Sequence, residues 1–354
     1  MSTGASSASG AGSRKRALAQ SPTALPAHAS QGGRRSLRVT SWCVSWNQIS
    51  DEAVGSFNKA MKVARVVEAL TGGSGGVPDV LLLQETPLGL LAALQRRGYV
   101  LLAEGEGMAV LAAERLRPTV LGSKLSGKGW VGVKVSSPDS GQLLLASLCL
   151  ARGSDEGASN ARKAELQQCV AALRSGSDDA MLIVAGDTNM RKVESWSLPE
   201  LRLRDAWIEA GEDRASRFTF DSTTNRFSAK CPAFACRFDR VLVSSRMAHN
   251  AMVRKGEVSL VGGPKPDEAI GFHLAGHFGV SAVVRFEGSY RGVDAGEGIR
   301  RGAPAVCAGS EIGRDRDSGA STKTPSPAPT ASPRKRIVVS AAKLLASLDD
   351  SDSD

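Results

Sequence analysis

Short apolar segments of strand length, most of them followed by a polar residue, constrain the fold of this chain most strongly. "PDVLLLQE" (78–85) and "AMLIVAGD" (180–187) are apolar on both faces, as buried strands are, and further short apolar stretches follow one another from residue 38 to residue 286. Helical spacing is confined to 51–70, 159–174 and a short stretch near 205–210. The pattern predicts an α/β fold in which two packed, mostly antiparallel β-sheets are flanked by helices, a four-layer sandwich.

Composition divides the chain into three parts. Residues 1–37 are rich in Ser, Gly and Ala and carry five basic residues and no acidic one, so we expect a disordered basic arm. Residues 38–287 contain the apolar strands and are the predicted folded domain. Residues 288–354 are rich in Gly, Ser and Pro with mixed charge, which predicts a disordered low-complexity tail. The chain has 354 residues and is 42% hydrophobic, enough for one large core.

The net charge of +9 is concentrated outside the predicted domain. The clusters "SRKR" (13–16) and "SPRKR" (332–336) are typical of segments that nuclear import receptors bind, and they also attract phosphate backbones. We therefore expect a nuclear protein, with the cytoplasm as a second location; a merely solvated tail is the alternative. The sequence has no apolar run of about 20 residues and no secretory signal, so we expect no membrane contact. No heptad pattern is visible, which favours a monomer.

The six cysteines are scattered without paired spacing. In a reducing compartment such cysteines are small buried hydrophobic residues more often than disulfide partners. Cys231 and Cys236 alone have a spacing that could belong to half of a zinc site, but no companion Cys/His cluster accompanies them.

Polar residues recur where the predicted strands end. A single Asp at a strand end is most often a turn or cap residue, but here several different polar types share this position. They are Asn47, after a predicted strand over 38–46, then Glu85, Asp187 with Asn189, Asp239 and His277. If these ends converge, they form one pocket of oxygen ligands, amide donors and one imidazole. Such a pocket suits Mg²⁺ and a phosphate ester.

The same segments carry a resemblance to a known family. In order, "SWN" (45–47), "PDVLLLQE", "AGDTNMR" (185–191), "FDRVLV" (238–243) and "GHFGV" (276–280) resemble the signature segments of the endonuclease/exonuclease/phosphatase superfamily of Mg²⁺-dependent phosphodiesterases. Thr188, Arg191 and "RFTFDSTTN" (217–225) are most similar to the branch that hydrolyses tyrosyl-DNA phosphodiesters. The resemblance spans about 38–286. It implies a Mg²⁺-dependent, or Mn²⁺-dependent, enzyme of DNA repair that acts on 5′-phosphotyrosyl ends of DNA, including single-stranded 5′ overhangs.

The resemblance also implies roles for individual residues. Glu85 is the expected Mg²⁺ ligand, and Asp187 is the expected base that activates water. Asn189 would orient that water or donate to the phosphate, and Asn47 would support the metal-side carboxylate. His277 would contact a non-bridging oxygen. Asp239 would hold His277 in its orientation. Phe220 would stack on a terminal base, and Arg191 and Arg237 would steer the phosphate backbone of the DNA.

A tyrosine leaving group is consistent with this set of residues. The pKa of a phenol is about 10, far below that of an aliphatic alcohol, so its departure needs little help from a general acid. Phe220 is also explained as a core residue of an alternating strand, and this interpretation stays open.

Three positions depart from the family pattern. Ile49 replaces an acidic residue, Cys149 replaces a histidine and Gly276 replaces an aspartate, and together these changes thin out the second metal position and part of the phosphate clamp. The alternative function is therefore a catalytically weak or inactive nucleic-acid-binding relative. Another nuclease of the superfamily, such as an abasic-site endonuclease or an RNA deadenylase, also remains open. In the tail, the apolar stretch 337–339 could add a strand to a ubiquitin-like partner.

Overall fold

The computed structural model describes residues 35–44, 59–72, 76–87, 89–177, 180–192, 194, 197–225, 233–244, 250–269, 271 and 273–287. These residues form two large β-sheets, a small hairpin-like pair of strands, and flanking helices. The helices are α1 (Lys59–Thr71), α2 (Leu90–Gln95), α3 (Glu156–Arg174), α4 (Ser197–Glu200) and α5 (Ala206–Glu209).

The first sheet is built around β1 and β16 and has the order β14-β16-β1-β2-β4-β3, with β15 also paired to β16. Its strands are β1 (Arg35–Cys43), β2 (Val80–Gln84), β3 (Tyr99–Gly105), β4 (Met108–Ala113), β14 (Asn250–Met252), β15 (Val258–Val261) and β16 (Gly279–Glu287). β1 and β2 are parallel, and the other pairs in this sheet are antiparallel.

The second sheet has the order β10-β13-β9-β8-β7-β5, with β6 also paired to β7. Its strands are β5 (Thr119–Val120), β6 (Leu125–Gly127), β7 (Trp130–Ser137), β8 (Gly141–Cys149), β9 (Met181–Asp187), β10 (Leu203–Asp205) and β13 (Asp239–Ser244). β8 and β9 are parallel, and their neighbours are antiparallel. The separate pair consists of β11 (Phe220–Asp221) and β12 (Ala235–Cys236).

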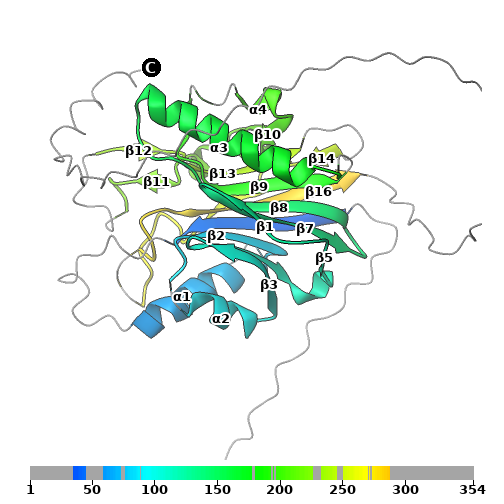
Figure 1. Ribbon diagram of the computed structural model, residues 1–354. Helices are drawn as coiled ribbons and strands as arrows, with labels where there is room; N and C mark the ends of the chain where they lie inside the picture. Colours follow the sequence, from blue (N-terminus) through cyan, green and yellow to red (C-terminus); the bar gives the residue numbers. More distant parts are fainter. Residues whose placement is uncertain are drawn as a thin grey trace, which may run out of the picture. The chain divides into compact units, whose positions relative to one another are not determined.

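Three groups of buried apolar side chains separate the layers. The central group fills the space between the sheets, for example with Leu82 of β2 and Leu145 of β8. A second group packs α3 on the outer face of the second sheet, and a third packs α1 and α2 on the outer face of the first. In Figure 1, α3 lies on one side of the paired sheets and α1 and α2 lie on the other. The predicted α/β sandwich of two mostly antiparallel sheets flanked by helices is therefore confirmed.

The predicted elements are largely present, with two informative differences. β1 runs from Arg35 to Cys43, so the strand predicted over 38–46 begins three residues earlier and ends at Cys43. Arg35–Leu37 pair with β16 and are part of the sheet, although composition predicts that they belong to the basic arm. α2 lies outside the three segments whose spacing predicts a helix. In the part of the chain described, no helix is long and apolar enough to cross a membrane.

Candidate active site

Three neighbouring strands of the second sheet meet at one edge, where β8 and β9 end and β13 begins. The register pairs Cys149 of β8 with Asp187 of β9, and Asp187 with Asp239 of β13. Gly186 precedes Asp187 at a point of close approach, because a Cβ at this position would overlap the backbone carbonyl of Leu148. Glycine thus keeps β8 and β9 paired up to their last residues, and this register places one thiol and two carboxylates on adjacent strands.

The first sheet contributes the end of β1 and the exit of β2. Cys43 is the last residue of β1 and pairs in register with Gln84, the last residue of β2. The buried Gln84 side chain donates from Nε2 to Oγ of Ser147 on β8 at 2.8 Å, which joins the two sheets close to the site. Glu85 follows with a φ of 49° and turns the chain out of the sheet, so that its side chain remains 26% exposed.

His277 enters the site from the loop before β16. Its Nδ1 lies 2.8 Å from Oδ2 of Asp239, and both side chains are buried. Trp42 Nε1 donates to the carbonyl oxygen of His277 at 2.9 Å. Asn225 Nδ2 donates to the carbonyl oxygens of the two residues before His277, at 2.9 and 3.0 Å. The loop is therefore held from two sides, and the imidazole is oriented by a carboxylate.

The carboxylate of Asp187 has one satisfied and one unsatisfied oxygen. Its Oδ1 accepts the backbone N–H of Asn189 at 3.2 Å, and the left-handed φ of 50° at Asn189 is one that asparagine tolerates better than most residues. Asn189 also donates from Nδ2 to the carbonyl oxygen of Leu150 at 3.0 Å. Oδ2 of Asp187 is buried and finds no hydrogen-bond partner among the described residues. Asn189 thus fixes the carboxylate and leaves one oxygen available for chemistry.

The pKa values of Asp187 and His277 are both raised, but for different physical reasons. Burial, followed by the charge of Asp239, raises the pKa of Asp187 to about 6, although His277, Arg152 and the Asn189 amide oppose the rise. Burial lowers the pKa of His277, but the charge and hydrogen bond of Asp239 and the charge of Asp187 outweigh it and raise the pKa to about 9. At neutral pH the site therefore holds an ionised Asp187 beside a protonated His277.

Glu85, the predicted metal ligand, forms an ion pair in this structure. Its Oε1 accepts from a terminal nitrogen of Arg152, whose side chain is 58% exposed. The charges of Glu85 and Asp187 both raise the pKa of Arg152, against the effect of burial. A guanidinium group therefore lies near the acidic cluster, in the neighbourhood where a divalent cation would also be attracted.

An aromatic cluster flanks the imidazole. The Phe220 ring lies 5.3 Å from the His277 ring in an edge-on arrangement and also packs against Phe238 at 5.9 Å. The guanidinium of Arg191 lies over the Phe238 ring at 4.8 Å and over Phe234 at 5.7 Å. Phe220 and Arg191 are thus both close to the site, and Phe220 is only half-buried. Base stacking by Phe220 stays a prediction.

The structure does not place Arg237 and Asn47, two other predicted site residues, among the groups described above. Arg237 forms an ion pair with Asp205 at 2.6 Å and stacks on the Trp207 ring at 4.5 Å, so its guanidinium is engaged within the protein. Its contact with substrate stays a prediction. Asn47 lies outside the described residues, as does Ile49. The strand that was expected to deliver Asn47 ends at Cys43, and the residue that β1 brings to the site is this cysteine.

Three residues of the site were not identified from the sequence. The sequence predicts Cys43 to be a small buried hydrophobic residue, and its place at a strand end becomes visible only from the β1–β2 register. Arg152 and Asn225 lie in loops, and their partners are 67 and about 50 residues away in the sequence. The only sequence signal for Asn225 is its place at the end of "RFTFDSTTN".

The donor groups fit a divalent cation. Glu85, Asp187 and Asp239 supply hard carboxylate oxygens, and Oδ2 of Asp187 and Oδ1 of Asp239 are buried without a hydrogen-bond partner among the residues described. Neighbouring acidic groups also contribute to the raised pKa values of Cys43, Cys149 and Asp187, after the larger effect of burial. Such a concentration of negative charge is stabilised by a bound cation.

Comparisons with known proteins define the class. A family profile described as Endonuclease/Exonuclease/phosphatase family matches residues 50–255, which is more than half of the chain. The chain therefore belongs to this family, and it is a hydrolase of the nuclease and phosphodiesterase type.

The individual relatives are more specific. Tyrosyl-DNA phosphodiesterase 2 of Danio rerio is 28% identical over 124 residues, which are 34% of this chain and 33% of that protein, so the match spans about a third of the relative's length. The crystal structure of the Danio rerio protein complexed with a single-stranded DNA product has a TM-score of 0.55 at 20% identity and covers 70% of this chain and 98% of that chain. Truncated tyrosyl-DNA phosphodiesterase 2 of Caenorhabditis elegans has a TM-score of 0.53 at 20% identity, with 71% and 98% covered. These two structures show a shared fold.

Proposed function

We propose that this protein is a Mg²⁺-dependent 5′-tyrosyl-DNA phosphodiesterase, which hydrolyses the bond between a topoisomerase tyrosine and a DNA 5′ end during DNA repair. The observation that carries the proposal is the arrangement of Asp187, Asp239 and His277, in which an ionised carboxylate and an oriented imidazolium share one buried site. The similarity to tyrosyl-DNA phosphodiesterase 2 supports the choice of substrate.

Asp187 is suited to accept the proton of the attacking water. A general base works best when its pKa lies near the working pH, and the pKa of Asp187 is about 6. The amide of Asn189 holds Oδ1, so Oδ2 is the oxygen that remains for the water proton. Asn189 is in this sense a positioning residue for the base.

His277 is suited to stabilise negative charge on the phosphate. Because Asp239 holds Nδ1, the ring nitrogen left to donate to a non-bridging oxygen is Nε2, and the raised pKa of His277 keeps the ring protonated. Preorganised donors of this kind are typically worth about 3–4 kcal/mol in the transition state. A phenolate leaves without a proton donor because the pKa of tyrosine is only about 10.

Glu85 would hold the divalent cation, with Arg152 displaced from it or sharing the phosphate. When bound, the cation supplies Lewis-acid neutralisation of the phosphate charge. The carboxylate of Glu85 is the ligand, and the backbone turn at Glu85, with a φ of 49°, directs it out of the sheet. The half-buried ring of Phe220 beside His277 offers an apolar surface for the terminal nucleotide. The basic clusters outside the described residues support a nuclear site of action as part of the same proposal.

The test is a cleavage assay with a 5′-phosphotyrosyl oligonucleotide and Mg²⁺. We expect a 5′-phosphate product, its loss in EDTA, and its loss in Asp187→Ala, while Asp139→Asn, a change at an exposed carboxylate, keeps full activity. No product from the wild type, or equal product from Asp187→Ala, would refute the proposal. Replacing the substrate by abasic-site DNA or polyadenylated RNA in the same assay separates the other nuclease specificities.

A further inference from the structure

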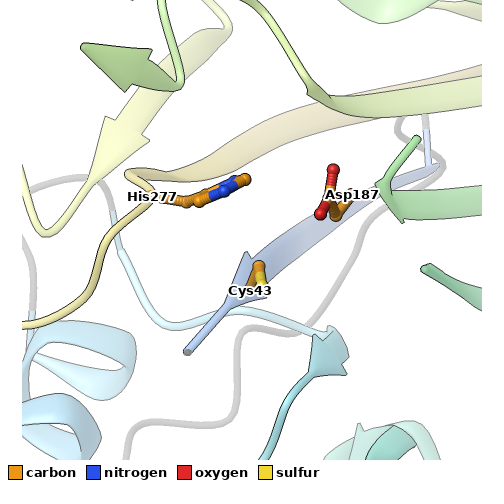
Figure 2. A group of neighbouring side chains, drawn as sticks. All are labelled: Cys43, Asp187 and His277. Atoms are coloured by element: carbon orange, nitrogen blue, oxygen red, sulfur yellow. The ribbon is translucent and has the colours of Figure 1, made fainter. Parts of the chain in front are cut away.

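A cysteine lies inside the candidate active site, beside the two groups that the proposed reaction uses. Cys43 is the last residue of β1 and is fully buried. One ligand atom each from Cys43, Asp187 and His277 lie within 4.8 Å of one another. Figure 2 shows the three side chains together, arriving from β1, from β9 and from the loop before β16.

Two of these three donors, the thiol of Cys43 and the imidazole of His277, differ in kind from those that Mg²⁺ prefers. Mg²⁺ binds through oxygen ligands, whereas thiolate and imidazole favour zinc and similar softer cations. Zn²⁺ binds cysteine sulfur, histidine nitrogen and carboxylate oxygen, and three protein ligands with a fourth position left open are typical of catalytic zinc sites. Tetrahedral bonds of about 2.0–2.3 Å imply ligand atoms about 3.5 Å apart, so a closure of about 1 Å by side-chain rotation would complete the site.

A second observation points independently to a cation at this position. Oδ2 of Asp187 is buried without a partner among the described residues, and Asp187 as a whole is 1% exposed. In addition, Asp239 accepts from Nδ1 of His277 at 2.8 Å. Metal-binding imidazoles typically donate their second nitrogen to a carboxylate, which fixes the ring orientation. Asp239 would be this outer partner.

We infer that Cys43, Asp187 and His277 form a binding site for a thiophilic divalent cation such as Zn²⁺, and that the bound ion inhibits the enzyme. Two protons pass to solvent as the ion binds: the thiol proton of Cys43 as the sulfur–metal bond forms, and the Nε2 proton of His277 as the nitrogen–metal bond forms. Inhibition follows because the ion occupies the oxygen of Asp187 and the nitrogen of His277 that hydrolysis requires. The inhibition rests on the proposed function, whereas the binding does not.

The binding is tested with cobalt as an optical probe on the full-length, metal-free protein. We expect Co²⁺ to produce a sulfur-to-cobalt charge-transfer band that Zn²⁺ abolishes by displacement. Cys43→Ser should lose this band and bind Zn²⁺ at least 10-fold more weakly. Cys149→Ser tests the neighbouring thiol and should keep the band, as should Cys169→Ala, a control in the α3 core. Loss of the band in Cys149→Ser but not in Cys43→Ser would overturn the assignment.

Two further measurements cover the remaining outcomes. X-ray absorption of the zinc-loaded wild type should show one sulfur neighbour at about 2.3 Å, and this result does not depend on whether Cys43→Ser folds. A zinc shell without sulfur would overturn the proposal. In the cleavage assay with Mg²⁺, Zn²⁺ should inhibit the wild type at concentrations at least 10-fold lower than Cys43→Ser. A protein that gives the cobalt band but no cleavage would contradict the proposed function alone.

Discussion

Replacing Asp187 by asparagine should stabilise the protein while removing its activity. Asp187 is 1% exposed, and its Oδ2 has no hydrogen-bond partner within the described ranges. Burial and the charge of Asp239 raise its pKa from the ordinary value of 3.8 to about 6. One pKa unit corresponds to about 1.4 kcal/mol, so the ionised carboxylate lowers the free energy of unfolding by up to about 3 kcal/mol. The asparagine side chain has nearly the same shape and carries no charge.

The sign of this effect fixes its pH dependence. Below about pH 4 Asp187 is protonated in both the folded and the unfolded state, so it contributes no destabilisation. Between about pH 4 and pH 6 the folded state binds more protons than the unfolded state, and stability falls as the pH rises. Above the folded pKa of about 6 the full penalty applies. Asp187→Asn should therefore gain stability at pH 8 and gain almost nothing at pH 4.

The assay is thermal and urea unfolding at both pH values in EDTA. For a domain of 150–250 residues, each kcal/mol shifts the Tm by about 2–4 °C, so we expect a Tm increase of up to about 10 °C at pH 8. Asp139→Asn is the matched control, because its side chain is 63% exposed and should change stability little. A destabilised Asp187→Asn, or an equal gain at both pH values, would refute the reasoning that a buried carboxylate with one unsatisfied oxygen destabilises the folded state.

Three other predictions concern the same groups. The wild-type rate of hydrolysis should rise with pH around 6, as Asp187 ionises, and fall around 9, as His277 loses its proton; a pH–rate profile without these limbs would contradict the assigned protonation states. Asp239→Asn removes the carboxylate that raises the pKa of His277, so NMR titration of the ring should give a pKa well below 9 and activity should fall by about 100-fold or more. Arg152→Ala should lower the Mg²⁺ concentration for half-maximal activity several-fold, because it frees the carboxylate of Glu85; an increased requirement would show that Arg152 assists cation binding.

The sequence predicts several residues of the site because the ends of buried strands can be recognised from the sequence. Buried strands such as β2 and β9 are continuous apolar runs, and a polar residue at the end of such a run marks the edge of the sheet. Glu85 and Asp187 were identified in this way, and the structure shows both at strand ends. Which strands neighbour one another depends on the order of the sheets, which no local pattern contains. For this reason the pairing of Asp187 with Asp239, across more than 50 residues, needed the structure.

The end of β1 was misjudged for a physical reason. The segment "SWCVSW" continues an alternating apolar pattern beyond Cys43, so periodicity alone gives no reason to stop the strand there. A buried cysteine is usually interpreted as a small hydrophobic residue, so its capacity to bind metal is easily overlooked. α2 was missed because it has only six residues, too few for helical periodicity, and begins after Gly89 with a φ of 88°.

The buried acidic groups of the site lower the stability of the protein, and the same groups give the site its chemistry. Strand register forces two carboxylates and a thiol onto neighbouring strand ends, and burial keeps water from screening them. The same burial and repulsion that cost stability raise the pKa of Asp187 into the range of a useful base, and the same carboxylates keep His277 protonated beside it. Cys43 adds a soft donor to this acidic cluster. Negative charge attracts all cations, so the donor atoms decide which cation binds at each position. The thiol of Cys43 favours a thiophilic ion beside Asp187 and His277. The carboxylate of Glu85 supplies an oxygen ligand, the kind that Mg²⁺ prefers.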